Sequence, residues 1–186
     1  MDRRELLKSI AVLTGASVIG ADVFLSACKP TASVGLFDKK TISLLDEIAE
    51  TIIPATNTPG AKAAEVGSFM NAIVSDCYTT EEQKVFIAGL KELEESAKKS
   101  HNKNFNELSD KEKHDFVVSL EKEAKAYNEK KVKDTPSHYY TMIKQLTLWG
   151  FFTSETGMTE TLKHVPIPGR YQGDVPYVKG DKAWAE

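Results

Sequence analysis

Histidine and cysteine are the side chains here that could hold a transition metal, and their spacing does not favour a metal site. The four histidines lie on separate segments, and the sequence contains no His-x-x-His or Cys-x-x-Cys pair of the kind that zinc sites commonly use. A carboxylate-bridged di-iron bundle needs Glu-x-x-His, and neither "EKH" at 112–114 nor "ETLKH" at 160–164 has that spacing. We therefore expect no metal in this chain.

Nucleophile and cofactor motifs are also missing from the sequence. Ser154 in "FFTSETG" lacks a Gly-x-Ser-x-Gly elbow, and a serine near a helix end is most often a cap. Flavin and nicotinamide folds need a strand followed by a glycine-rich turn, and c-type haem needs Cys-x-x-Cys-His. The sequence shows neither pattern, so none of these cofactors is expected. The sequence predicts a chain that is not itself an enzyme.

Cys28, unlike the possible metal ligands and nucleophiles above, lies in a sequence context that favours covalent modification. It ends "LSAC", which resembles a lipobox, where small residues precede a cysteine whose thiol receives a diacylglycerol. Acyl chains would anchor the protein, since each buried methylene contributes about 0.8 kcal/mol. Lys29 stands where an inner-membrane retention signal would place Asp, so we expect a periplasmic, lipid-anchored protein with the outer membrane favoured. The alternative is a plain signal peptide that is cut nearby, with Cys28 unmodified.

The residues before Cys28 predict a secretory leader. Arg3, Arg4 and Lys8 precede a weakly apolar run over 10–24, which polar residues interrupt and which is shorter than the roughly 20 residues of a membrane span. "DRRELLK" resembles the twin-arginine (Tat) export motif, although arginine pairs also occur by chance in ordinary leaders. We assign residues 1–27 to a Tat-type lipoprotein signal peptide.

The remaining chain is long enough for one domain with a hydrophobic core. We assign 28–37 to a tether and 38–186 to a helical domain. The net charge of -3 and the absence of a basic stripe argue against nucleic-acid binding. If Cys28 carries lipid, Cys77 is the one thiol left, so it is either buried or paired with another chain. Its place at the end of the apolar stretch "FMNAIVSDCY" favours burial.

Apolar residues at helical spacing predict an all-α bundle of about five helices, with no strand-like alternation to compete. Caps and prolines delimit these helices. The first should run from Asp38 or Thr41 to Pro54 and the second from 65 to 77. The third should run from a capping box at 79–82 to the polar run at 98–104, and the fourth from a second box at 109–112 through Tyr127. The fifth should have Pro136 in its first turn and end at about Ser154.

Residues 156–186 break this pattern. They are rich in glycine and proline, yet they keep tyrosine, tryptophan, valine and isoleucine, which a disordered tail would normally lack. Such a segment needs a surface to lie on, and either its own bundle or a second protein could supply one. We expect an extended docking tail.

Three blocks of sequence carry a family resemblance. "AETIIPATNTPGAKAAEVGSFMNAIV", "LTLWGFFTSETG" and "VPIPGRYQGDVPY", spread over 49–177, resemble the gluconate 2-dehydrogenase subunit 3 family. The resemblance implies a non-catalytic small subunit that assists folding, Tat co-export and membrane anchoring of a large FAD-dependent oxidoreductase of the glucose-methanol-choline type. That partner would oxidise a sugar or sugar acid, often with a cytochrome c subunit carrying haem c.

The resemblance also points to contact residues. "PATNTPGA" should form a rigid turn, either an internal connector or part of an interface. Some aromatic rings around Gly150 must be core, and those facing outward would be interface anchors. The expected partner-binding residues are Trp149, Phe151, Phe152, Pro168, Gly169, Arg170, Tyr171 and Tyr177. The alternative is an autonomous periplasmic lipoprotein that binds a sugar or peptide.

Overall fold

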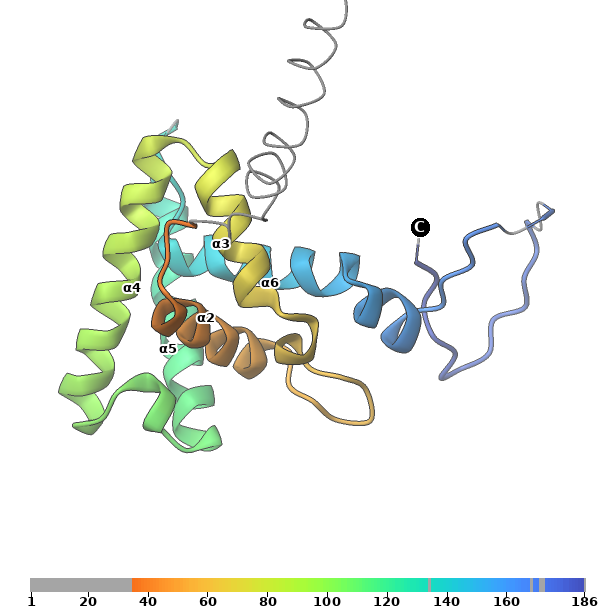
Figure 1. Ribbon diagram of the computed structural model, residues 1–186, viewed down its shortest axis with the longest axis horizontal. Coiled ribbons are helices and arrows are strands. Elements are labelled where there is room, and N and C mark those ends of the chain that lie inside the picture. The colour runs from red at the N-terminus through yellow and green to blue at the C-terminus, as the bar shows by residue number, and fades with distance from the viewer. Residues whose placement is uncertain (1–34, 134, 168, 171–172, 186) are drawn as a thin grey trace, which may run out of the picture. The chain divides into compact units, whose positions relative to one another are not determined.

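The computed structural model describes residues 35–133, 135–167, 169–170 and 173–185. These residues contain no strand, only an isolated bridge between Lys163 and Trp184. Their α-helices are α2 (Lys39–Ile52), α3 (Val66–Cys77), α4 (Thr80–His101), α5 (Asp110–Lys130) and α6 (Tyr139–Thr153), as Figure 1 shows. Shorter helical turns are η1 (Ala61–Ala64), η2 (Phe105–Glu107) and η3 (Gly157–Thr161). The predicted all-α fold is confirmed.

The predicted leader and most of the tether lie outside the described residues, and so do Arg3, Arg4 and Cys28. Within the described part of the chain, no helix has both the length and the hydropathy that a membrane crossing requires.

Local capping signals in the sequence begin three of the helices. Asp38 caps α2. Thr79 and Glu82 form a capping box at α4, with the Glu82 carboxylate accepting from the Thr79 backbone N–H at 2.9 Å. Ser109 and Glu112 form the same box at α5 at 2.8 Å. These caps satisfy backbone donors that the first helical turn leaves free, so the helix starts are fixed locally, as predicted.

Helix α6 is the centre of the bundle, because it contacts each of the other four α-helices. Its sequence is apolar over most of its circumference, and Tyr140, Ile143 and Phe151 are almost completely buried. Gly89 of α4 allows close approach to α6, since a Cβ at this position would lie 2.0 Å from Cγ of Tyr139. Helices α4 and α5 both pack on α6 more extensively than on each other.

Three sequence-based expectations were wrong. Helix α4 continues through the polar run to His101, because its charged side chains face solvent and Asn102 ends it in the left-handed region at φ 53°. Pro136 precedes α6, whose N-cap is His138, so it is not in the first turn. Cys77 is exposed, because α3 ends there and the ring of Tyr78 packs against the core instead.

Candidate partner-binding surface

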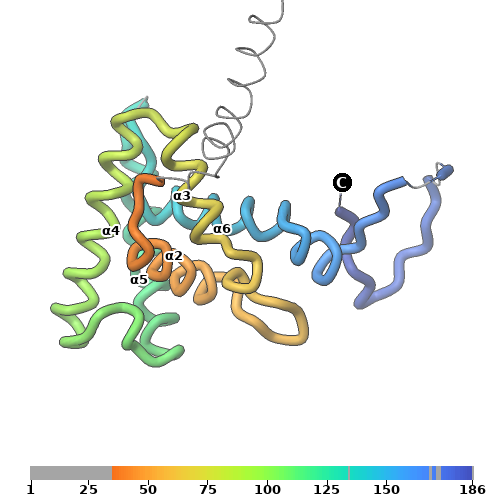
Figure 2. The backbone as a smooth tube through the Cα atoms, viewed as in Figure 1, coloured from red at the N-terminus to blue at the C-terminus, as the bar shows by residue number. Residues whose placement is uncertain are grey.

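The loop between α2 and α3 is held by carboxylates on α2, and Figure 2 traces its path. The Glu50 carboxylate accepts from the backbone N–H groups of Ala55 and Lys62, both at 2.8 Å. Asp46 accepts from the Gly67 backbone N–H at 2.7 Å. Carboxylate acceptors bond backbone N–H groups more strongly than neutral ones do. These bonds hold both ends of the loop on α2, which agrees with the turn predicted for "PATNTPGA".

Glu47 binds two lysines from different segments, Lys62 after the loop and Lys113 on α5. The Lys113 Nζ lies 2.9 Å from the Glu47 carboxylate, and the Lys113 side chain is only 11% exposed. Burial alone would raise the pKa of Glu47, but hydrogen bonds and charge from both lysines lower it below its ordinary value. The hydrogen bond to Glu47 raises the pKa of Lys62. This network joins α2, the loop and α5.

Asp46 has the opposite electrostatic balance. Burial raises the pKa of its carboxyl, and the hydrogen bond from Gly67 only partly offsets that effect. Gly60 packs closely on Glu50, since a Cβ at this position would lie 2.3 Å from Glu50 Oε1. The carboxylates of Glu50 and Asp46 thus hold the backbone of the loop and of the start of α3 in place.

The C-terminal end of α6 presents apolar side chains to solvent. Leu148, Trp149 and Phe152 are 40%, 52% and 39% exposed, and their spacing places them on one side of the helix. The Trp149 ring contacts Phe69 edge-on, with centroids 5.3 Å apart. Large exposed aromatic groups on one helix face are typical of interface anchors.

One expectation about this helix end needs correction. Phe151 is 1% exposed, because α6 turns it into the core, so it cannot contact a partner of the folded domain. Gly150 makes room for the ring of Phe69, since a Cβ at this position would lie 2.6 Å from Cδ1 of that ring.

The tail after η3 folds back, so that residues 183–185 contact Lys163. The backbone N–H of Lys163 donates to Ala183 at 2.8 Å, that of Ala185 donates to Lys163 at 3.1 Å, and the Lys163 ammonium lies 4.1 Å from the centre of the Trp184 ring. Residues 157–161 form a π-helical turn, so the prediction that the whole of 156–186 is extended was wrong at this end.

Between these contacts the tail is uncovered. Ile167 and Tyr177 are 84% and 86% exposed. Gly169 and Arg170 are also exposed, while Pro168 and Tyr171 lie outside the described residues. Of the two surfaces considered for the tail, its own bundle does not bury these apolar groups.

Sequence reasoning missed several of these residues. Leu148 belongs to the exposed α6 face, and its spacing from Phe152 could have revealed it. Asp46, Glu47 and Glu50 were not among the predicted site residues, although acids in the two turns before a Pro/Gly loop are well placed to bind its N–H groups.

The described residues define a small all-α domain in which carboxylates hold the α2–α3 loop and most of the large exposed apolar side chains belong to α6 and the tail. They contain no cluster of three or more metal-ligating side chains. A family model described as gluconate 2-dehydrogenase subunit 3 matches residues 39–169, well over half of the chain. The chain belongs to this family, as the sequence predicted. Comparison with curated proteins and with solved structures gave no match.

Proposed function

We propose that this chain is a non-catalytic accessory subunit of an FAD-dependent dehydrogenase of the glucose-methanol-choline type that acts on a sugar or sugar acid. It binds the folded flavoprotein, its Tat-type leader takes both to the periplasm, and lipid on Cys28 anchors the complex to the membrane. A cytochrome c subunit with haem c would pass the electrons on. The observation that carries this proposal is the exposed apolar surface of α6 and the tail in a family named for a dehydrogenase subunit.

The two parts of that surface suit different modes of contact. Trp149 and Phe152 are large rings on a rigid helix, and such groups lose little conformational entropy when a partner covers them. The tail places Ile167 and Tyr177 on backbone without regular structure, which can follow the shape of a partner. The helix end would anchor the flavoprotein and the tail would extend the contact.

Co-purification from the native host tests the partner. The tagged full-length chain should bring down a yellow, FAD-containing protein, and the double variant Trp149→Ala/Phe152→Ala should recover at least tenfold less of it, since losing two anchors costs about 2 kcal/mol or more. Val132→Ala is the matched control, because Val132 is an exposed apolar residue outside this surface. Recovery of a colourless monomer alone would instead favour an autonomous lipoprotein.

The leader tests concern export and anchoring separately. Replacing Arg3 and Arg4 by lysine should leave the flavoprotein in the cytoplasm, and normal periplasmic dehydrogenase activity in that strain would rule out the carrier role.

Cys28→Ala should release the complex from membranes in soluble form with its activity intact, because the lipid anchors and does not catalyse. Fractionation followed by a dye-reduction assay measures both results.

A further inference from the structure

Contacts between the two ends of the tail close it into a loop. The backbone N–H of Lys163 donates to the Ala183 carbonyl at 2.8 Å, and the N–H of Ala185 donates to the Lys163 carbonyl at 3.1 Å. These two bonds form a parallel bridge between Lys163 and Trp184. The Lys163 ammonium lies 4.1 Å from the centre of the Trp184 ring, within reach of a cation–π attraction. We name these four residues the clasp, and Figure 1 shows the chain returning to the end of η3 where the clasp lies.

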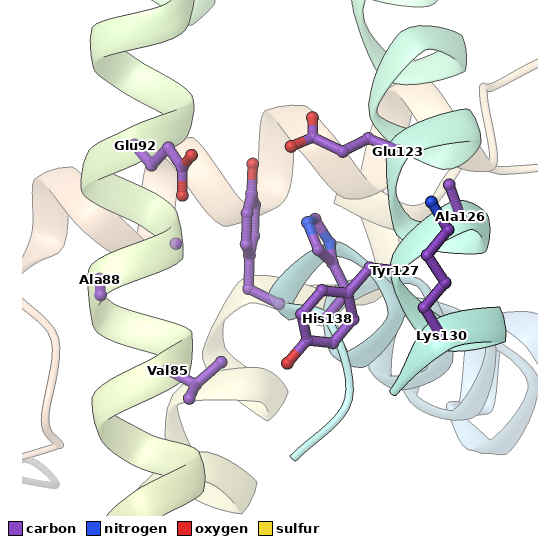
Figure 3. A pocket seen from close by; sticks show the side chains of 10 residues that line it. Val85, Ala88, Glu92, Glu123, Ala126, Tyr127, Lys130 and His138 are labelled. Atoms are coloured by element: carbon purple, nitrogen blue, oxygen red, sulfur yellow. The ribbon is translucent and has the colours of Figure 1, made fainter. Parts of the chain in front are cut away.

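The clasp joins the tail to itself and to η3, and it does not tie the tail to the bundle. Its one further link is the Lys182 ammonium, which donates to the Glu160 carbonyl of η3. Among the described residues, no hydrogen bond, ion pair or ring contact joins residues 163–185 to any of the five α-helices. The groove in Figure 3 is lined only by residues of α4, α5 and the start of α6, so the tail does not lie in it. The clasp therefore orders the tail without adding to the core of the domain.

The loop that the clasp closes carries apolar side chains in solvent. Ile167 and Tyr177 are the two most exposed large apolar side chains of the described residues, and both lie between the ends that the clasp joins. A free tail would lose all of its chain entropy at the moment of binding, whereas a tail whose ends are already joined has lost part of it beforehand. Ordering of this kind raises the affinity for a partner by lowering the cost of binding.

We propose that Lys163 and Trp184 are positioning residues for the partner interface. They close residues 164–182 into a preformed loop, and this loop, rather than a free tail, binds the flavoprotein. This inference rests on the proposed function. The clasp fixes where both ends of the loop lie, while the backbone between them can still adapt to the partner. Trp184 acts through Lys163, so binding does not require the partner to touch the Trp184 ring.

Hydrogen exchange on the full chain tests the clasp without the partner. Trp184→Ala should lower the protection of the Lys163 and Ala185 amides about two- to fivefold, because the cation–π contact that holds the bridge closed is lost. Lys163→Arg should keep the protection of the Ala185 amide, since a guanidinium also stacks on a tryptophan ring. The Lys62 amide, which is bonded to Glu50, is the internal reference and should not change. Unchanged protection at both tail amides in Trp184→Ala would overturn the role of the ring.

Recovery of the flavoprotein from the native host tests what the clasp does. The tagged full-length chain with Trp184→Ala should recover about two- to fivefold less FAD-containing protein than the wild type, because the apparent affinity falls with the fraction of closed loop. Tyr127→Ala is the matched control, because the Tyr127 ring is 45% exposed, close to the 50% of Trp184, and lies on α5. Equal recovery with Trp184→Ala and with the wild type would refute the proposal.

A reversible staple separates loop closure from a direct contact of the Trp184 ring with the partner. Lys163→Cys/Trp184→Cys places thiols on bridge partners, whose Cα atoms are about 5 Å apart, within the range of a disulfide. Cys77→Ser in the same chain removes the other exposed thiol. The oxidised staple should restore wild-type recovery, and its reduced form should match Trp184→Ala. Low recovery with the oxidised staple would show that the ring itself contacts the partner, and the proposal would then be wrong.

Failure of the clasp and failure of the proposed function give different results. If Trp149→Ala/Phe152→Ala lowers recovery of the flavoprotein and Trp184→Ala does not, the clasp proposal is refuted and the proposed function stands. A wild-type chain that brings down no flavoprotein would refute both.

Discussion

The loop at 54–65 and the tail at 162–185 have similar compositions but are held in different ways. Both are rich in proline and glycine. The loop is fixed at its two ends by carboxylates of α2, which accept from its backbone N–H groups. The tail has contacts near its ends, through Lys163, Ala183 and Trp184, and long exposed stretches between them.

This difference shows that proline and glycine content does not decide whether a segment is rigid. The acceptors that a neighbouring helix offers decide it, because a backbone N–H that is bonded to a carboxylate loses its freedom at that point. A segment fixed in this way is scaffold. A segment that leaves Ile167 and Tyr177 uncovered has apolar surface still to bury, and a partner can bury it.

The largest predicted effect comes from removing the charge that joins the loop to α5. Glu47→Ala should lower the free energy of unfolding by about 2 to 3 kcal/mol at pH 7, because the nearly buried Lys113 loses its counter-ion. Urea unfolding measures this change. Glu155→Ala, at an exposed position beyond α6, is the control and should change stability by less than about 0.5 kcal/mol.

The same variant predicts a pH dependence. Because the folded pKa of Glu47 lies below its ordinary 4.5, the stability that this carboxylate contributes is complete above pH 4.5 and is lost as the pH falls through the folded value. The difference between wild type and Glu47→Ala should therefore shrink in acid. A difference that stays constant from pH 7 down to pH 3 would contradict the ion-pair explanation.

A smaller effect is expected at Glu50. Glu50→Ala removes the acceptor for the Ala55 and Lys62 amides and should cost about 1 to 2 kcal/mol, a value limited by the partial exposure of these bonds. Hydrogen exchange should show both amides losing protection, while the Lys163 amide in the tail keeps its own. Full protection at Lys62 in this variant would mean that other contacts hold the loop.

The parts of the fold that the sequence could predict depend on interactions between residues a few positions apart. Capping boxes at Thr79 and Ser109 join residues three positions apart, so the sequence contains both partners. The sequence does not predict which of the two adjacent rings on α6 is buried, because Phe151 and Phe152 are the same residue type. Their sides are set by Phe69 and the other helices around α6, which sequence spacing alone does not locate.

The candidate site was predictable to a similar extent. Aromatic residues in the tail and at the end of α6 marked the exposed surface, and Trp149, Phe152 and Tyr177 are on it. The Glu47–Lys113 pair spans 66 positions, and Glu92 of α4 and Glu123 of α5 line the same surface groove. Such pairs follow from the packing angles of helices, so no local pattern reveals them.

The smallest effect on stability, and the sharpest test of the comparison, is deletion of residues 163–186. The described hydrogen bonds that this deletion removes are the Lys163 backbone pair, the bond from the Asp181 N–H to the Val178 carbonyl and the bond from Lys182 to the Glu160 carbonyl, and the Lys163–Trp184 contact is lost with them. All of these contacts are exposed, so unfolding should become easier by less than about 0.5 kcal/mol. Urea unfolding should give the same slope within error, since little buried surface is lost. The flavoprotein should nevertheless co-purify less well with the shortened chain. A stability loss above about 2 kcal/mol would show instead that the tail belongs to the domain core, and the contrast with the α2–α3 loop would then disappear.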